Sequence, residues 1–219
     1  MKTPLKHIIH DHTFWLSPER VIFWEEKRAL ILSDLHFGKT GHFRKAGIPV
    51  PQHVYKQDLQ RLFHQVQHFQ PSQLIVVGDL FHSNTNRELD LFYKWRKDHA
   101  TLSIHLVKGN HDILKDDCYQ QADIHTSKEL ILPPFSFLHD PQQTATGGTS
   151  DHYCFSGHLH PGIVMKGTGK QTLRFPCFYF GEDRAILPAF SRFTGIAPIE
   201  PKENEKVFVI VENKVVELQ

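Results

Sequence analysis

Five clusters of polar side chains that can bind metal ions each follow a short apolar run of the sequence. A single Gly-Asp pair at the end of a strand is in most proteins only a turn. Five such clusters in succession indicate instead that the ends of several strands share one site. In chain order the clusters are Asp34-x-His36, Gly78-Asp79, Gly109-Asn110-His111-Asp112, His139 and Gly157-His158-x-His160.

The side chains in these clusters offer both oxygen and imidazole ligands. This mixture suits Mn, Fe or Zn, whereas Ca prefers oxygen ligands alone. Seven ligands are too many for one ion and predict two divalent ions that share a bridging ligand. Two ions stabilise the entering and the leaving oxygen of an in-line displacement, and a water between them would be ionised near neutral pH. The seven predicted ligands are Asp34, His36, Asp79, Asn110, His139, His158 and His160.

The apolar runs ahead of the first three clusters have the length of β-strands. They lie at 29–32, 74–77 and 104–107 and are apolar on both faces, which is typical of a covered sheet. The spacing of apolar residues predicts a helix over 51–69 and a second one over 86–98. Strands that alternate with helices pair in parallel through right-handed crossovers, so their carboxyl ends meet at the edge where α/β sheets bind ligands.

The second half of the chain is predicted to be mostly β-structure. Short runs at 135–138 and 153–155 lead into the last two clusters, and the runs 206–211 and 215–218 predict a C-terminal hairpin. The segment 141–151 is polar, contains glycine and lacks periodicity, so we expect a mobile loop there.

The composition indicates one α/β domain that covers residues 1–219, with no insertion large enough for a cap domain. Hydrophobic residues make up 40% of the chain and charged residues 22%, which excludes disordered and disulfide-scaffold classes. The net charge of +1 means that any site for a polyanion must be a local cluster. Three cysteines without a C-x-x-C pair, the lack of a signal-peptide pattern and the lack of a long apolar stretch predict a cytoplasmic protein.

The five clusters, read as SDLH, GDLFHS, GNHD, a later histidine and SGHLH, resemble the calcineurin-like metallophosphoesterase superfamily. The resemblance covers roughly residues 30–162. It implies a four-layer α/β/β/α sandwich with two mixed β-sheets and a dinuclear metal site at their edge. It also implies ligand roles: Asp34, His36 and His160 would hold one metal, Asn110, His139 and His158 the other, Asp79 would bridge, and His111 would be the general acid.

His139 is the ligand at which this sequence departs from the family pattern. Many members have a glycine after this histidine, whereas here Asp140 and Pro141 follow. His125 and His152 are therefore alternatives, but His139 ends a strand-like run and is the expected ligand. Asp112 is expected to be a structural hydrogen-bonding residue rather than a ligand.

Finer features resemble the DNA-repair nucleases within this superfamily. In that branch a histidine three positions after the bridging aspartate pairs with the catalytic histidine, and His82 matches that position. The stretches 34–51 and 184–195 resemble the bacterial ligase-associated DNA damage response endonuclease family (PdeM). That resemblance implies an endonuclease that functions with an ATP-dependent DNA ligase, a helicase and an exonuclease.

A basic stretch after the first cluster is a candidate for binding the phosphate backbone. It contains the predicted substrate-binding residues Lys39, Arg44 and Lys45, and such cations provide the largest sequence-independent contribution to nucleic-acid affinity. Phe37, just before this stretch, and Phe43, within it, would stack on unpaired bases. The alternative is a solvated basic loop with both aromatic side chains in the core. Arg192 and Phe193 are further candidates for the same groove.

The function expected from these features is a phosphodiesterase or endonuclease that acts on DNA and takes part in DNA repair. Its cofactors would be two divalent ions, with Mn favoured and Fe, Zn, Ni or Mg as the other options. A phosphomonoesterase or a nucleotide phosphodiesterase for a small substrate is the first alternative. A catalytically inactive scaffold is the second, although all seven ligands and His111 are present.

Overall fold

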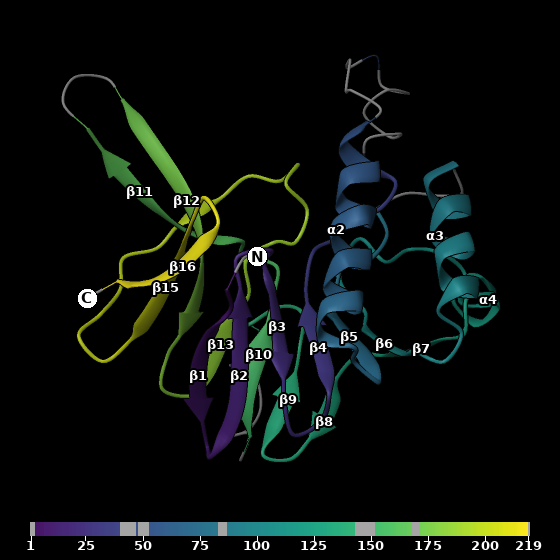
Figure 1. Cartoon of the computed structure of the whole chain (residues 1–219), viewed down its shortest axis with the longest axis horizontal. Helices are drawn as coiled ribbons and strands as arrows, with labels where there is room; N and C mark the ends of the chain where they lie inside the picture. Colours follow the sequence, from purple (N-terminus) through teal and green to yellow (C-terminus); the bar gives the residue numbers. More distant parts are fainter. Residues whose placement is uncertain are drawn as a thin grey trace.

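A computed structural model describes residues 3–39, 47, 53–82, 87–142, 152–167 and 171–218. Two β-sheets pack face to face, and three helices cover the outer face of the first sheet (Figure 1). None of these helices is long and apolar enough to cross a membrane.

The first sheet has seven strands in sequential order. Its first half is an antiparallel meander, and from β4 onward every pairing is parallel. Helices α2 (His53–Phe69), α3 (Arg87–Asp98) and α4 (Asp116–Gln121) connect the parallel strands, which confirms the predicted strand–helix alternation. The strands are β1 (Leu5–Ile9), β2 (His12–Ser17), β3 (Val21–Trp24), β4 (Ala29–Leu32), β5 (Gln73–Val77), β6 (Ser103–Val107) and β7 (Ile124–Ser127).

The second sheet contains the second half of the chain and is mixed. It includes the predicted C-terminal hairpin, and a long hairpin of β11 and β12 projects from the body of the molecule (Figure 1). Its strands are β8 (Leu130–Leu132), β9 (Phe135–Phe137), β10 (Tyr153–Ser156), β11 (Pro161–Lys166), β12 (Thr172–Phe180), β13 (Arg184–Ile186), β14 (Ala197–Pro198), β15 (Lys206–Val211) and β16 (Lys214–Leu218). Most of the loop predicted over 141–151 lies outside the described residues.

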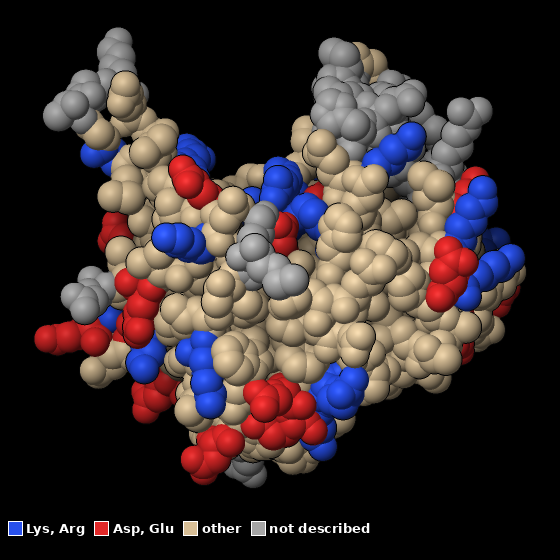
Figure 2. All heavy atoms as spheres, viewed as in Figure 1, with Lys and Arg blue, Asp and Glu red and all other residues tan. Residues whose placement is uncertain are grey.

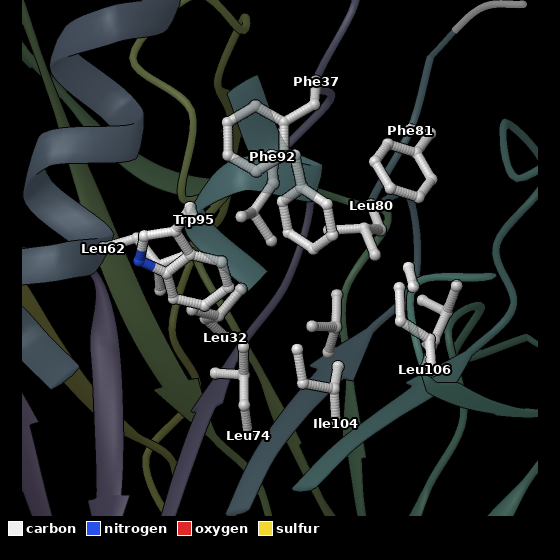
Figure 3. Packing of buried hydrophobic residues seen from close by; sticks show 14 of the residues in the cluster. Leu32, Phe37, Leu62, Leu74, Leu80, Phe81, Phe92, Trp95, Ile104 and Leu106 are labelled. Atoms are coloured by element: carbon white, nitrogen blue, oxygen red, sulfur yellow. The ribbon is translucent and has the colours of Figure 1, made fainter. Parts of the chain in front are cut away.

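Alternating residues of the parallel strands enter two separate cores. In β4, Leu30 and Leu32 face the helices, whereas Ala29 and Ile31 face the second sheet. All four are fully buried, which explains why these strands are apolar on both faces. Figure 3 shows the core beneath the helices, where Phe92 and Trp95 of α3 pack over Leu74 and Ile104.

The α/β class and the two mixed sheets agree with the sequence-based expectation. All three crossovers, through α2, α3 and α4, place their helices on the same face of the first sheet, as right-handed connections require. Within the described residues, no helix covers the outer face of the second sheet, so the expected second helical layer is not formed there.

His7, one of 17 histidines, is a half-buried residue of β1 whose titration should destabilise the fold in acid. Its ring lies 4.5 Å from the ring of Phe180 and 4.9 Å from that of Phe208. Burial, assisted by the charge of Lys206, lowers the pKa of His7 from 6.5 to about 4. Between these two values the unfolded chain binds a proton that the folded chain rejects, so stability falls as the pH falls.

We therefore expect His7→Leu to flatten the acid side of the stability profile. From pH 6.5 to 4, wild type should lose on the order of 1–2 kcal/mol more than the variant, after a discount for the partial exposure of His7. Urea unfolding at pH 7, 5.5 and 4.5 measures the difference. His68→Leu, on an exposed part of α2, is the control, and parallel profiles for wild type and His7→Leu would contradict the expectation.

Candidate functional site

The predicted site residues meet where the two sheets present their carboxyl edges. Three adjacent parallel strands of the first sheet, β4, β5 and β6, end there, and so do β9 and β10, which are parallel neighbours in the second sheet. The side chains come from the segments directly after these strands: Asp34 and His36 after β4, Asp79 after β5, Asn110 and His111 after β6, His139 after β9, and His158 and His160 after β10.

The first group of candidate ligands consists of Asp34, His36 and His160. Their ligand atoms all lie within 4.8 Å of one another. Nε2 of His160 is 3.1 Å from Oδ1 of Asp34, and Nε2 of His36 is 3.9 Å from the same oxygen. Asp34 is completely buried, whereas the side chain of His160 is 20% exposed. The group therefore forms a buried cluster with one side toward solvent.

Buried polar atoms in this group fit a metal ion. Oδ1 of Asp34 and both ring nitrogens of His36 have no hydrogen-bond partner within the part of the chain that the structure describes. A buried polar atom without a partner costs about 1–3 kcal/mol, and coordination of a cation removes that cost. Carboxylate oxygen and imidazole nitrogen are also the donors that divalent transition metals accept.

The second group consists of Asp79, Asn110, His139 and His158, with His139 in the middle. Nε2 of His139 is 3.2 Å from Oδ1 of Asn110, 3.3 Å from Nδ1 of His158 and 3.5 Å from Oδ2 of Asp79. Asp79 and His139 are buried, whereas Asn110 and His158 are exposed. This half of the site is open to a substrate.

A backbone contact sets the ring orientation of His139. Its Nδ1 lies 3.0 Å from the carbonyl oxygen of Val77 and is placed to donate to it. That bond turns Nε2 toward the cluster, and once Nε2 has lost its proton this is the arrangement found in metal-binding histidines. The two histidines considered as alternative ligands to His139 lie elsewhere. His125 on β7 stacks on His105 at 5.2 Å, and His152 precedes the amino end of β10.

The backbone at this edge adopts the left-handed conformation repeatedly. Non-glycine residues rarely do so, and each instance costs on the order of 1–3 kcal/mol unless the surrounding structure enforces it. Such residues concentrate at functional sites because the unusual backbone directs side chains to a common point. Five candidate ligands have positive φ: Asp34 (54°), His36 (50°), Asp79 (52°), His158 (66°) and His160 (49°).

Two glycines of the motifs make room for the ligands. A Cβ atom on Gly78 would lie 1.9 Å from Nδ1 of His139, and one on Gly109 would lie 2.2 Å from Oδ1 of Asp79. Both distances are far shorter than any real Cβ contact, so any larger residue would displace a ligand. The glycines of GDLFHS and GNHD are therefore required by the close approach of the strand ends.

Burial at His36 and a charged contact at Asp79 stabilise the ligand-competent forms of these two residues. Burial lowers the pKa of His36 to about 3, although Asp34 and Asp79 act in the opposite direction, so this imidazole is neutral. Burial would raise the pKa of Asp79, but its contact with His139 outweighs that effect and holds the pKa below the usual aspartate range. The same contact raises the pKa of His139 against the effect of burial. In the metal-free protein Asp79 and His139 therefore behave as an ion pair.

The two predicted catalytic histidines lie against each other beside the first group. The ring centroids of His82 and His111 are 4.3 Å apart, at an interplanar angle of 34°. Both rings also contact His36, at centroid distances of 5.2 and 5.4 Å. The backbone N–H of His111 donates to Oδ1 of Asp79 at 2.9 Å, which fixes the start of its side chain next to the site.

Asp112 is a structural hydrogen-bonding residue, as expected from the sequence. Its buried carboxylate accepts the backbone N–H groups of Asp79 (2.8 Å), Gly109 (2.9 Å) and Phe81 (3.0 Å). Burial raises its pKa to about 6, although the three N–H groups favour the charged form, so it is ionised at pH 7.5. It thereby ties the segment after β5 to the segment after β6.

Replacing Asp112 by alanine should destabilise the protein even without metal. Three buried N–H groups would lose their acceptor, and with partial rescue by water we expect a loss of about 3–5 kcal/mol in unfolding free energy. Urea unfolding at pH 7.5 with chelator present measures this loss. Asp117→Ala, at an exposed position of α4, is the matched control. A loss below about 1 kcal/mol would show that the three bonds are not important.

Of the predicted substrate-binding residues, only Lys39 lies within the described part of the chain. Its backbone N–H donates to the carbonyl of His36 at 3.1 Å. Burial lowers its pKa, while the charges of Asp34 and Asp79 act in the opposite direction, so its ammonium group is close to the site. Arg44 and Lys45 lie outside the described residues.

The proposed base stacking by Phe37 is wrong. Phe37 is only 3% exposed and packs in the core beneath the helices, 5.6 Å from the ring of Phe92. The alternative reading of this residue as part of the core is therefore correct. Phe43 lies outside the described residues.

Sequence reasoning missed Arg61, a buried residue of α2 close to the site. Asp58, Arg61 and Gln65 have helical spacing, which normally indicates a solvated face of a helix. All three are instead buried: Asp58 and Arg61 bond to the segment that follows β13, and Gln65 accepts a hydrogen bond from Ser17. No signal in the sequence distinguishes such a buried polar face from an exposed one.

Comparisons with known proteins agree with this geometry. The crystal structure of the Pseudomonas putida nuclease MPE is similar, with 29% sequence identity, a TM-score of 0.83, and coverage of 99% of this chain and 100% of that chain. The phosphoesterase Yfce from E. coli is far more distant, with 10% identity, a TM-score of 0.45, and coverage of 87% and 97%. No curated protein matches the sequence.

The model of the calcineurin-like phosphoesterase family matches residues 27–176. This range is more than half of the chain and contains every candidate ligand and both candidate catalytic histidines. The resemblance seen in the five clusters is thereby confirmed, and the chain belongs to the calcineurin-like phosphoesterase family.

Proposed function

We propose that this phosphoesterase is a metal-dependent nuclease that cleaves phosphodiester bonds in DNA. The observation that carries the proposal is the pair of His82 and His111 beside the two groups of candidate ligands, since the leaving sugar oxygen of DNA needs a proton that an imidazole can supply. The similarity to the P. putida nuclease over nearly the whole chain supports it.

The proposed ligand roles follow the two groups of side chains. Asp34, His36 and His160 would hold one ion, Asn110, His139 and His158 the other, and Asp79 would lie between them. When bound, the two ions lower the pKa of water and neutralise charge on the phosphate oxygens. The mixed oxygen and nitrogen ligands accept several divalent ions; Mn is the ion that we propose, and Fe, Zn, Ni and Mg are the other candidates.

The histidine pair would handle the proton of the leaving group. His111 would hold a proton on its imidazole ring and pass it to the sugar oxygen as the P–O bond breaks. The ring of His82, 4.3 Å away, would keep that imidazole in place. Lys39 would neutralise part of the phosphate charge at the same edge. Phosphoryl transfer mainly requires positioning and charge stabilisation, so few other groups are needed.

A role in DNA repair belongs to this proposal. The resemblance of 34–51 and 184–195 to the ligase-associated endonucleases suggests that the enzyme works with an ATP-dependent DNA ligase, a helicase and an exonuclease. A cytoplasmic location is part of the same proposal, because a bacterial repair nuclease meets its substrate there.

The decisive experiment compares three classes of substrate with Mn²⁺ present: DNA, an aryl phosphodiester and an aryl phosphomonoester. The nuclease proposal expects cleavage of defined single- and double-stranded DNA, and turnover of a bis-aryl phosphodiester above that of an aryl monophosphate. Preference for the monoester without nicking of plasmid DNA would favour the small-substrate alternative. Lack of bound metal after purification with Mn²⁺, together with no turnover of any substrate, would favour the inactive scaffold.

A further inference from the structure

The segment between β13 and β14 runs along the rim of the metal site. The backbone N–H of Ser191 donates to the carbonyl of Asp34 at 3.1 Å, and that of Ala197 donates to the carbonyl of His160 at 3.0 Å. Residues 192–196 therefore pass from one candidate ligand to another. Any polymer that enters the site from this side must cross them.

A buried ionic network holds the start of this segment. Arg61 of α2 donates to the carboxylates of Glu19 at 2.6 Å and Asp58 at 2.7 Å. The same guanidinium donates to the carbonyl of Phe190 at 3.0 Å and lies 4.3 Å from the centre of its ring. The side chains of these three charged residues are at most 10% exposed.

Further bonds fix the next residue of the segment. Arg20 donates to the carbonyl oxygens of Ala189 (3.0 Å) and Ser191 (2.9 Å), and the hydroxyl of Ser191 donates to Asp58 at 3.0 Å. Buried ion pairs add little net stability because their desolvation is costly. Their clear effect is to fix the backbone of 189–191 against Asp34.

Arg192 follows this fixed backbone and carries the unbalanced charge of the network. Three arginines, Arg20, Arg61 and Arg192, face two carboxylates, Glu19 and Asp58. The side chain of Arg192 is 54% exposed and lies 3.4 Å from Glu19. Burial, together with the neighbouring positive charges of Arg61 and Arg192, lowers the pKa of Arg20 to about 10, so the cluster retains a positive field.

The surface above this segment is concave and basic at its floor. Figure 2 shows a hollow between the projecting β11–β12 hairpin and the upper end of α2. Lys and Arg side chains gather near its middle, with acidic side chains between them, where Figure 1 draws the chain between β13 and β14. An extended polyanion fits such a hollow better than a small phosphate ester does.

We propose that Arg192 binds a backbone phosphate of the DNA strand next to the phosphate that is cleaved. The proposal rests on the nuclease function and adds a substrate contact to it. A guanidinium can form a bidentate contact with a phosphate, and less entropy is lost here because the backbone just before Arg192 is already held by the network. The contact would favour polymers over small esters.

The test measures binding of a fluorescent single-stranded oligothymidylate to the full-length protein in chelator at several salt concentrations. Arg192→Ala should weaken binding about tenfold at low salt and reduce the slope of log K against log salt by about 0.7, the value for one phosphate contact on a single strand. Arg192→Lys should keep the slope and lose part of the affinity. Lys27→Ala removes a positive charge at the amino end of β4, on the opposite edge of the sheet, and is the control.

Turnover with Mn²⁺ gives a second readout. In Arg192→Ala, the ratio of kcat/KM for the oligonucleotide to that for a bis-aryl phosphodiester should fall about tenfold. If the wild type cleaves DNA but Arg192→Ala matches Lys27→Ala in slope and ratio, the role of Arg192 is refuted and the nuclease function stands. If the wild type neither binds nor cleaves DNA, both are refuted.

Discussion

Replacing His111 by alanine should lower kcat for DNA cleavage by about 10²- to 10⁴-fold while the protein keeps its metal ions. His111 belongs to neither group of candidate ligands, and only its backbone N–H contacts Asp79. Loss of its imidazole therefore removes the proton donor and leaves the ligand set unchanged. Single-turnover cleavage of a defined oligonucleotide measures the rate, and mass spectrometry measures the metal content.

The leaving group provides an internal check on the proton-donor role. A nitrophenolate leaves without much help from an acid, whereas the sugar oxygen of DNA must be protonated. The His111→Ala variant should therefore lose far less activity on a bis(4-nitrophenyl) phosphodiester than on DNA. Equal losses on both substrates would assign His111 to binding or charge stabilisation instead.

His64→Ala is a matched control, because it removes a histidine from an exposed position of α2. The kcat of His82→Ala for DNA cleavage should lie between those of His111→Ala and His64→Ala, since His82 touches the ring of His111 and is expected to orient it. An unchanged rate in His111→Ala with both ions bound would remove the general-acid role.

The parallel half of the first sheet and the location of the site were predictable from the sequence because both depend on local patterns. Runs such as 29–32 are apolar on both faces only when layers cover both faces, and the ends of parallel strands must share an edge. Each motif contributes its ligands within four residues of such an end. Their convergence therefore follows from the topology.

The antiparallel strands β1 to β3 were not predicted, and the reason lies in their turn and their edge position. His10 and Asp11 both have positive φ, as a two-residue hairpin turn requires, but the usual signal there is Asn-Gly or Asp-Gly. β1 is an edge strand with only partly buried residues, so its apolar pattern is weak.

The buried polar residues that hold the rim of the site were also not predictable from the sequence, because their role depends on contacts between residues far apart in the chain. Arg61 and Ser191 are far apart in sequence, and each has the appearance of a surface residue. Only the folded chain shows that Asp58 contacts both of them. The ligands are therefore readable from motifs, whereas the residues that hold the rim in place are not.

The second large loss of DNA cleavage is expected on replacement of Asp79, the aspartate proposed to lie between the two ions. Asp79→Asn keeps the shape of the side chain and its bond to the N–H of His111 but removes the negative charge. Purified variant should contain fewer than two ions per chain, and DNA cleavage should fall more than about 10³-fold, because charge stabilisation by both ions is lost. Asp116→Asn removes one charge from a surface pair with Lys108 and is the control. Two bound ions and near-normal cleavage in Asp79→Asn would reject the bridging role.

The metal-free protein offers a separate test of the same residue through its contact with His139. The pKa of His139, about 9, is above the ordinary value of 6.5, so the contact contributes fully below pH 6.5 and is lost as the pH rises through about 9. The pKa of Asp79 is depressed, so the contribution is present above the ordinary aspartate pKa and is lost in stronger acid. In chelator, wild type should therefore exceed Asp79→Asn in unfolding free energy by about 2 kcal/mol near pH 5–6, and the difference should shrink toward pH 9. A difference that instead grows with pH would show that the two side chains do not form an ion pair. Any loss of metal in Asp79→Asn would then be due to the missing carboxylate itself and not to a broken ion pair with His139.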